Sequence, residues 1–352
     1  SSCAQEPLIV EFTKSEKAFP LIYTTPQCIR NDDFDGDGDQ DLFIGSRTFP
    51  WGYGKTPPSY FLVNDGQGNF SKSEELKLGM VKDARWVDID EDQDADLIVA
   101  LEWGGIISLT NEDGKFTQKT LTDKKGFWNT IYPTDFNTDG KIDFLLGNLG
   151  ENSRIKATEE KPIRLYVNDM DDNGRLDQIL THYLAKEEVI FADKKELEKQ
   201  MPFIRKKYNL AKDFAKASIE AVFGPEKIKG STVFEVNYLK HAALINLADG
   251  NFELVPLSWK SQIGPISAFS KINSTADHIF GGNFFDANIQ LGRYDGSLGG
   301  ILNDQGKFRN IPGISLKGQI RKILPFDIKG ETCYLIVRNN DSLIVLKKGE
   351  LP

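Results

Sequence analysis

Short apolar runs recur along the chain, and residues that favour turns separate them. Four such runs lead to an Asp-Gly or Gln-Gly pair and then to a phenylalanine. These runs are Tyr60–Val63, Ile106–Leu109, Ala243–Ile245 and Gly300–Leu302. Runs this short favour strands, and Asp-Gly pairs are typical of tight hairpin turns. The pattern therefore predicts a chain built mostly of β-hairpins.

These strands group into units of four that repeat about every 45–55 residues, which is typical of the blades of a β-propeller. The first three units cover residues 20–80, 81–122 and 123–187. Later units keep the strand–turn–strand pattern around Asp277 and Asp327. We therefore expect an all-β fold, a β-propeller of six or seven four-stranded blades.

One segment departs from the strand pattern. Asp193 and Glu196 have the spacing of a helix capping box, and Leu197 and Met201 continue with helical spacing until Pro202 interrupts it. A second helical run follows. We expect this insertion to pack on the propeller rim, and the docking of a partner is the alternative. The expected organisation is propeller blades in residues 1–187, a helical insertion in 188–230, and further blades in 231–352.

Four acidic loops carry the most specific chemistry. Each places an oxygen-bearing side chain at loop positions 1, 3, 5 and 9, and an apolar, strand-like run follows. Their odd-numbered positions hold Asp33, Asp35, Asp37, Asp39 and Asp41 in the first loop, and Asp88, Asp90, Asp92, Asp94 and Asp96 in the second. The third holds Asp135, Asn137, Asp139, Lys141 and Asp143, and the fourth holds Asp169, Asp171, Asn173, Arg175 and Asp177.

This spacing suits a calcium ion, which takes about six to eight oxygen ligands. Alternate residues of a tight loop can aim their oxygens at one centre. Position 7 can supply its backbone carbonyl, which explains why Lys141 and Arg175 are tolerated there. The carboxylate at position 9 would complete the shell and open the next strand. The four loops therefore predict four calcium sites.

Two alternatives apply to these loops. Asp, Asn and Gly are common in ordinary turns, but four copies with one spacing favour a metal-binding role. An EF-hand needs flanking helices and a glutamate at position 12. Position 12 here is Ile44, Val99, Leu146 or Leu180, and strand-like residues follow. EF-hands are therefore excluded, and the incomplete loops near Asp277 and Asp327 are expected to hold no strong calcium site.

Composition, charge and cysteine content narrow the classes of protein to which the chain can belong. The chain has 352 residues and a formal charge of −9, which argues against a general nucleic-acid binder. It contains no apolar run long enough to cross a membrane. Cys28 and Cys333 lie in apolar contexts and are expected to be buried thiols or, alternatively, to form a disulfide. Cys3 is a candidate lipid-anchor cysteine, the one membrane contact expected.

The acidic loops and the Leu-Phe-Ile-Gly type runs after them resemble FG-GAP/VCBS repeats, which form the propellers of integrin α-subunits and of many bacterial surface proteins. Gly147–Gly150 and Lys199–Phe203 resemble a bacterial subgroup of secreted or outer-membrane proteins. The resemblance implies a calcium-binding propeller with a helical insert. It also implies a protein that is secreted, periplasmic or associated with the outer membrane.

The ends of the blades opposite the calcium loops are expected to bind a ligand. Aromatic residues with arginine and asparagine suit a carbohydrate or protein ligand, because rings supply contact area and polar groups fix orientation. The candidate ligand-binding residues are Trp51, Trp103, Arg293 and Tyr294. The three histidines have no metal-ligand spacing, so a non-enzymatic binding module is favoured. The alternative is a polysaccharide lyase that acts on uronate-containing glycans.

The chain ends are expected to close the ring. The last unit supplies only three strands, and Leu8–Phe12 is an unassigned strand before the first unit. An unpaired edge would expose backbone hydrogen-bonding groups. We therefore expect Leu8–Phe12 to pair with the strand around Leu343–Leu346.

Overall fold

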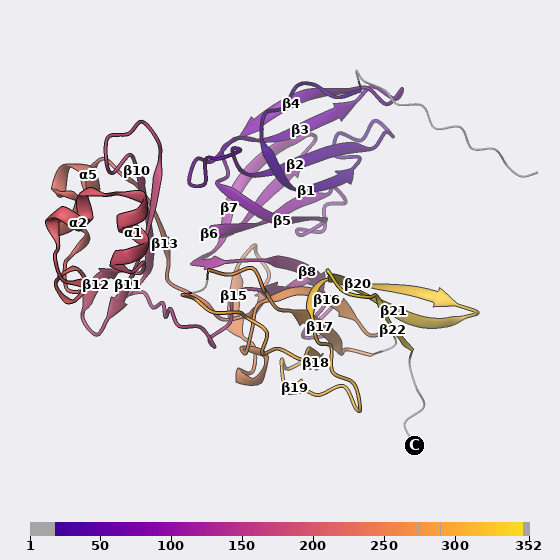
Figure 1. The fold of residues 1–352 in the computed structure, drawn as a ribbon. Helices are drawn as coiled ribbons and strands as arrows, with labels where there is room; N and C mark the ends of the chain where they lie inside the picture. Colours follow the sequence, from indigo (N-terminus) through magenta and orange to yellow (C-terminus); the bar gives the residue numbers. More distant parts are fainter. Residues whose placement is uncertain (1–17, 274, 289, 348–352) are drawn as a thin grey trace, which may run out of the picture.

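The computed structural model describes residues 18–273, 275–288 and 290–347 (Figure 1). The fold is all-β with six small sheets, and the α-helices lie in one segment of the chain. Within the described residues, no helix has the length and apolar character needed to span a membrane. The predicted strand Leu8–Phe12 and Cys3 lie outside the described residues.

Two antiparallel meanders begin the fold. Sheet 1 contains β1 (Thr25–Asp32), β2 (Asp41–Thr48), β3 (Ser59–Asn64) and β4 (Phe70–Leu76). Sheet 2 contains β5 (Met80–Val87), β6 (Asp96–Glu112) and β7 (Lys115–Phe127). In both sheets an acidic loop joins the first strand to the second. The pairing of Asp32 with Asp41 places the first loop directly at a hairpin end.

Sheet 3 is discontinuous in sequence. It contains β8 (Thr130–Thr134), β9 (Asp143–Gly147), β14 (Ala242–Asn246) and β15 (Phe252–Pro256). Ala242, Ala243 and Leu244 of β14 pair with Leu146, Leu145 and Phe144 of β9. The predicted third unit, residues 123–187, therefore does not form one sheet, because residues 148–241 separate its second strand from its third.

These intervening residues form a unit with its own sheet, seen at the left of Figure 1. The sheet has the order β12-β11-β10-β13, and five short helices cover it. The strands are β10 (Ile163–Asn168), β11 (Asp177–Leu184), β12 (Glu187–Ile190) and β13 (Thr232–Val236). The helices are α1 (Lys194–Gln200), α2 (Phe203–Lys207), α3 (Ala211–Phe214), α4 (Ile219–Phe223) and α5 (Pro225–Lys229).

Local sequence explains the start of this helical segment. The Asp193 side chain accepts a hydrogen bond from the Glu196 backbone N–H at 2.9 Å, and Pro202 separates α1 from α2. Leu197, Met201 and Ile204 are buried against Ile179 of β11. The helices thus form one core with the insertion sheet. This unit is larger than the helical segment 188–230 that the sequence predicted.

Two further sheets complete the fold. Sheet 4 contains β16 (Ile266–Lys271), β17 (His278–Gly282), β18 (Gly300–Leu302) and β19 (Phe308–Arg309), after a short 3-10 helix at Trp259–Ser261. Sheet 5 contains β20 (Gln319–Ile328), β21 (Glu331–Asn339) and β22 (Ile344–Lys347). Cys28 on β1 and Cys333 on β21 are both buried free thiols, so the predicted disulfide alternative is wrong.

Sheets 1 to 5 stack in sequence order, face against face. Alternation along β6 shows how: Leu97 and Val99 pack in the core with sheet 1, whereas Ile98 and Ala100 pack in the core with sheet 3. Side chains of a strand alternate between its two faces, so a sheet covered on both sides is apolar throughout. Continuous runs such as Leu97–Leu101 therefore belong to the middle of the stack.

The first strands of sheets 1 to 5 meet around one cavity of about 530 Å³, which we call the inner cavity. Its walls come from β1, β5, the start of β8, β16 and β20. The sequence predicted six or seven blades. Among the described residues, five sheets surround this cavity, and the sixth belongs to the insertion.

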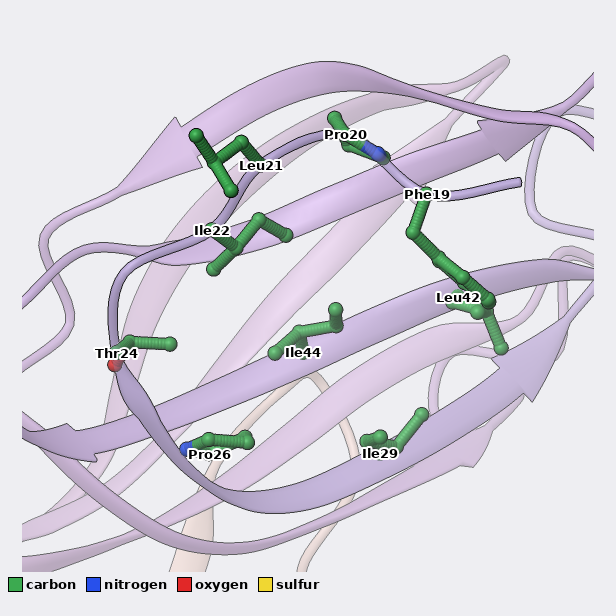
Figure 2. Close-up of a pocket in the computed structure, with 9 residues that line it drawn as sticks. All are labelled: Phe19, Pro20, Leu21, Ile22, Thr24, Pro26, Ile29, Leu42 and Ile44. Atoms are coloured by element: carbon green, nitrogen blue, oxygen red, sulfur yellow. The ribbon is translucent and has the colours of Figure 1, made fainter. Parts of the chain in front are cut away.

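In the described residues, each of the two end sheets of the stack leaves some apolar side chains of its outer face exposed. In sheet 1, Ile29 is 53% exposed, and it borders an open groove with Leu42 and Ile44 (Figure 2). Phe19–Ile22 lie along the same groove. In sheet 5, Leu324 and Val345 are 44% and 47% exposed. Within the described part of the chain, no further sheet covers the outer faces of sheets 1 and 5.

Candidate functional site

The acidic loops occupy equivalent places in sheets 1, 2 and 3. Each joins the first strand to the second, and Asp41, Asp96 and Asp143 are the first residues of β2, β6 and β9. The fourth loop instead joins β10 to β11 in the insertion sheet, where Asp177 begins β11. The expectation that all four loops share one face of the stack is therefore wrong for the fourth.

Three of the four loops gather their carboxylates. In each, three carboxylate oxygens lie within 4.8 Å of one another. The groups are Asp33, Asp35 and Asp37; Asp88, Asp90 and Asp96; and Asp169, Asp171 and Asp177. Each group includes positions 1 and 3 of its loop. Position 5 completes the first group, and position 9 completes the other two.

Unpartnered oxygen atoms accompany these three groups. Asp41 Oδ2, Asp88 Oδ1 and Asp171 Oδ1 are buried and have no hydrogen-bond partner among the described residues. A buried oxygen without a partner costs free energy, and most such atoms in proteins are paired. A hard cation such as Ca²⁺ prefers oxygen ligands of this kind. The donor set of the first, second and fourth loops therefore fits calcium.

The position-9 carboxylates also fasten the loops to their sheets. Asp41 Oδ1 accepts the backbone N–H of Asn64 at 2.8 Å. Asp96 Oδ1 accepts that of Asn111 at 2.8 Å, and Asp143 Oδ1 accepts that of Asn246 at 2.8 Å. None of these asparagines was predicted from the sequence. Their signal is an Asn at the end of the strand that leads to the Asp-Gly turn in each unit.

Burial raises the pKa of the position-9 carboxyls. The pKa of Asp41 is about 6, and the nearby Asp35 and Asp37 charges add to the effect of burial. The pKa of Asp96 is also about 6, with burial as the largest cause and Asp90 and Asp92 contributing. A carboxyl with a raised pKa is one whose negative charge is disfavoured. A bound cation would relieve this repulsion.

The third loop is organised differently. Its carboxylates are not among the gathered groups found in the described residues. The Asn137 amide donates to Asp139 Oδ2 at 2.8 Å, and Asp135 accepts the backbone N–H groups of Asp139 and Gly140. Asp33 and Asp169 accept loop backbone N–H groups in the same way, so the third loop differs chiefly in having an amide, Asn137, at position 3 where the other loops have a carboxylate.

The remaining loop positions shape the turns. Asp92 Oδ1 accepts the backbone N–H of Asp94 at 2.9 Å, and Asn173 Oδ1 accepts that of Arg175 at 2.8 Å. At position 7, the Asp39, Asp94, Lys141 and Arg175 side chains lie outside the gathered groups. The incomplete loops gather no such group in the described structure: Asp277 pairs with Arg309, and Asp327 accepts from Thr332 Oγ1 at 3.2 Å.

A second cavity, of about 440 Å³, lies at the starts of the first strands, which are the ends opposite the acidic loops. We call it the mouth cavity. All five stacked sheets contribute to it, and the insertion adds Ile155 and Leu180. Trp103 and Tyr294, two of the four predicted ligand-binding residues, line it. Trp103 and Asn283 at its wall have φ of 64° and 78°, an unfavourable region for these residues that occurs often at functional sites.

The other two predicted ligand residues lie outside the mouth cavity. Trp51 is fully exposed in the loop after β2, beside Gly174 and Arg175 of the fourth acidic loop. Arg293 stacks on the Phe285 ring at 3.7 Å and lies near Asp295. Tyr294 points the other way, and its hydroxyl hydrogen-bonds to Ser153 Oγ at 2.7 Å. Arg293 and Tyr294 are therefore neighbours in sequence that do not share a site.

A charged network forms one wall of the mouth cavity. Glu102 forms a two-point ion pair with Arg47 and accepts from the Tyr53 hydroxyl at 3.2 Å. Trp103 Nε1 donates to the same Tyr53 oxygen at 2.7 Å. Burial works to raise the pKa of Glu102, but the Arg47 hydrogen bond and the Lys82 charge outweigh it and the pKa is lowered. Glu102 is therefore a fixed anion that holds the wall together.

The histidines have structural roles. His241 is fully buried; its Nδ1 accepts the Asn148 backbone N–H at 2.8 Å and its Nε2 lies 2.9 Å from the Gly264 carbonyl oxygen. Burial lowers the pKa of His241 to about 4. His278 is also buried, next to Thr134, with its pKa lowered by burial to about 4. Both are neutral groups of the core.

Comparison with known proteins identifies the repeat. Residues 33–99 and 88–146 each match the family model of the FG-GAP-like repeat. The first match begins at the first acidic loop and the second match begins at the second loop. No curated protein matches the chain in sequence.

Solved structures resemble the chain only distantly. BBS1N in complex with ARL6DN is 11% identical, with 96% of each chain covered and a TM-score of 0.30. The extracellular domain of the B. thetaiotaomicron protein BT3049 is 11% identical; 93% of this chain and 40% of that chain are covered, with a TM-score of 0.22. The V. cholerae biofilm matrix protein Bap1 is 10% identical, with 92% and 56% covered and a TM-score of 0.23.

Proposed function

We propose, on the premise that this chain carries FG-GAP-like repeats, that it is a calcium-stabilised extracellular interaction module whose scaffold is a β-propeller. Its ligand would be a carbohydrate or a protein, bound in the mouth cavity. We further propose that the protein is secreted, periplasmic or associated with the outer membrane.

Calcium would serve the scaffold. The first loop would hold an ion with Asp33, Asp35 and Asp37, and the second with Asp88, Asp90 and Asp96. The fourth loop would hold one with Asp169, Asp171 and Asp177. Bound calcium neutralises clustered carboxylates and cross-links the loop to the strands on both sides of it. These loops would therefore stiffen the sheets that carry the mouth cavity.

Ring closure is part of the propeller proposal. Sheets 1 and 5 stand at the two ends of the stack, and both line the inner cavity. Each also exposes apolar side chains on its outer face in the described structure, Ile29 in sheet 1 and Leu324 in sheet 5. Covering both faces at once would bury apolar area at about 25 cal/mol per Å². We propose that these two sheets face one another in the closed ring.

The mouth cavity is the observation that carries the interaction function. Ligand sites are commonly concave, largely apolar and furnished with a few polar groups. This cavity combines Trp103, Phe127 and Leu291 with Asn129 and Asn283. Its walls come from distant parts of the chain, so the fold must form before the site exists. A rigid scaffold that presents such a cavity suits recognition of a ligand.

A glycan array and a peptide library, each with calcium present, test this function. Ala287→Trp, which would fill the cavity from its wall, should abolish binding of any ligand found, and Trp51→Ala on the outer loop is the matched control. Melting curves check that both variants fold. Binding that survives Ala287→Trp but is lost on changing Lys206 and Lys207 of α2 would place the site on the insertion and contradict the proposal.

A polysaccharide lyase is the second candidate function. Arg293 and Tyr294, which are adjacent in sequence, do not favour it as a cation and base, because Tyr294 is held by Ser153 and burial raises the pKa of its hydroxyl. Lys82 favours it: this residue lines the mouth cavity with Arg321, and burial lowers its pKa. A lyase needs a base beside a cation that neutralises a uronate. Formation of unsaturated products from uronate polymers is the assay, and its absence would remove this candidate.

A further inference from the structure

Five residues line both the inner cavity and the mouth cavity. They come from the first strands of the five stacked sheets, or from the residue just before the strand in the case of β8. They are Gln27, Lys82, Asn129, Ser267 and Arg321. Because the same residues border both cavities, the two cavities adjoin at these residues, and we call the two together the axial channel. We call these five residues the waist.

Backbone irregularities aim four of the waist residues into this channel. The strand register shifts between Pro26 and Cys28 and between Val81 and Asp83. It shifts likewise between Ile266 and Ala268 and between Ile320 and Lys322. The residue left over in each shift is Gln27, Lys82, Ser267 or Arg321. A β-bulge redirects a side chain, and bulges are frequent beside functional sites.

The channel is cationic although the whole chain is acidic. Arg30, Arg85 and Lys322 line the inner cavity together with the waist cations Lys82 and Arg321. The one acidic residue lining the inner cavity is Asp83. The formal charge of the whole chain is −9, so five cations around one cavity are a local excess of positive charge in an acidic protein.

Both carboxylates near the waist are already occupied. Asp83 pairs with Arg30 and Arg85 through Oδ1, and its Oδ2 accepts from Thr130 Oγ1 at 3.0 Å and the Ile131 backbone N–H at 3.1 Å. In the mouth cavity, Glu102 is paired with Arg47. Asp83 is therefore fully engaged, whereas Glu102, whose pKa the nearby Lys82 charge lowers, compensates Lys82 in part.

Lys82 and Arg321 are the cations left over. Within the described part of the chain, no carboxylate lies within ion-pair distance of either side chain. Burial is the largest cause of the lowered pKa of Lys82, and the Arg47 and Arg321 charges add to it, while Glu102 opposes it. Two cations that face one channel and have no direct ion-pair partner among the described residues favour an anionic ligand between them.

We propose that the waist is an oxyanion site that binds the carboxylate of an acidic sugar within the axial channel. Lys82 and Arg321 would contact the carboxylate, and Gln27 and Ser267 would offer hydrogen bonds to it. The sugar ring would lie toward the mouth cavity, against Trp103. This inference rests on the proposed function, since it names the ligand class of the same cavity.

Calorimetric titration of the calcium-loaded protein with galacturonate, galactose and inorganic sulfate tests the proposal. Galacturonate should bind, with an affinity that falls as salt rises, and galactose should bind at least about tenfold more weakly. Sulfate should compete with galacturonate. Equal affinity for galacturonate and galactose would overturn the oxyanion inference and leave a carbohydrate module standing. Binding of sulfate without galacturonate would also overturn it, since the site would then take free anions only.

Variants locate the site. Arg321→Gln and Lys82→Met should each weaken galacturonate binding about tenfold or more. Lys329→Gln, the same loss of charge at the exposed far turn of the β20–β21 hairpin, is the matched control and should change nothing. Ser267→Glu places a negative charge in the waist and should abolish binding; it serves if Lys82→Met fails to fold. Unchanged affinity in Arg321→Gln and Ser267→Glu would refute the assignment.

Discussion

Removing calcium should destabilise this protein more than any single substitution. In three loops, three carboxylates bring oxygens within 4.8 Å of one another, and each of these loops has a buried carboxylate oxygen with no partner in the described structure. Without a cation, the native state must bear the repulsion of these charges. The unfolded chain separates them. Calcium therefore binds the native state preferentially and stabilises it.

The expected magnitude follows from the number of gathered loops. A ligand present at 100 times its Kd that binds only the native state stabilises it by about 2.7 kcal/mol per site. Three independent sites would contribute about 8 kcal/mol. Globular domains have total stabilities of about 5–15 kcal/mol. Chelation should therefore lower the melting temperature drastically or leave the protein unfolded at room temperature.

The assay combines metal analysis with melting. Protein dialysed against calcium should contain three tightly bound ions, and its melting temperature should fall on addition of excess EDTA. Asp90→Ala should remove one ion from the second loop. Asp135→Ala should have the smallest effect among loop variants, because the third loop does not gather its carboxylates. Asp277→Ala is the control, since that carboxylate pairs with Arg309.

Two results would refute this reasoning. The first is a melting temperature that is the same with EDTA and with calcium. The second is a loss of bound calcium in Asp277→Ala that equals the loss in Asp90→Ala. Either result would mean that the loops are acidic turns held by their own backbone hydrogen bonds.

Three other outcomes are expected. Asp83→Ala should lower the free energy of unfolding by about 3–5 kcal/mol in urea titrations, because it leaves Arg30 and Arg85 without their buried partner; a loss below about 1 kcal/mol would contradict this. The folded-state pKa of His241 is about 4, below its ordinary value of 6.5. The stability that its neutral ring contributes is therefore fully present above pH 6.5 and is lost as pH falls toward 4. That loss is about 3 kcal/mol and should be absent in His241→Gln, measured as stability against pH. Deleting residues 1–14 should cause aggregation or a large drop in melting temperature if Leu8–Phe12 closes the ring, and a truncated protein that melts like the parent would disprove closure.

The sequence determined the local structure of this protein. Apolar runs bounded by Asp-Gly turns specify hairpins, because turn geometry and side-chain alternation act between near neighbours. The acidic spacing was equally local: Asp33, Asp35 and Asp37 lie close together because one tight loop carries all three. Asp193 and Pro202 likewise fixed where helices begin and end.

Only the tertiary structure decided which strands share a sheet. The strand at Ala242–Asn246 pairs with Asp143–Gly147 across 94 intervening residues, and each segment alone has only a generic strand pattern. The fourth acidic loop thereby falls in the insertion, although its spacing matches the others. Pairing between distant strands depends on complementary packing, which composition does not encode locally.

The residues that line the cavities also divide into those that the sequence indicated and those that only the fold brings together. Of the four ligand-binding residues predicted from the sequence, Trp103 and Tyr294 line the mouth cavity, whereas the fold directs Trp51 and Arg293 elsewhere. Lys82 has no sequence signal at all. A bulge in β5 turns it toward the axis of the stack, where residues from four other sheets meet it. Such a site exists only after folding, because its members are brought together by the packing of whole sheets.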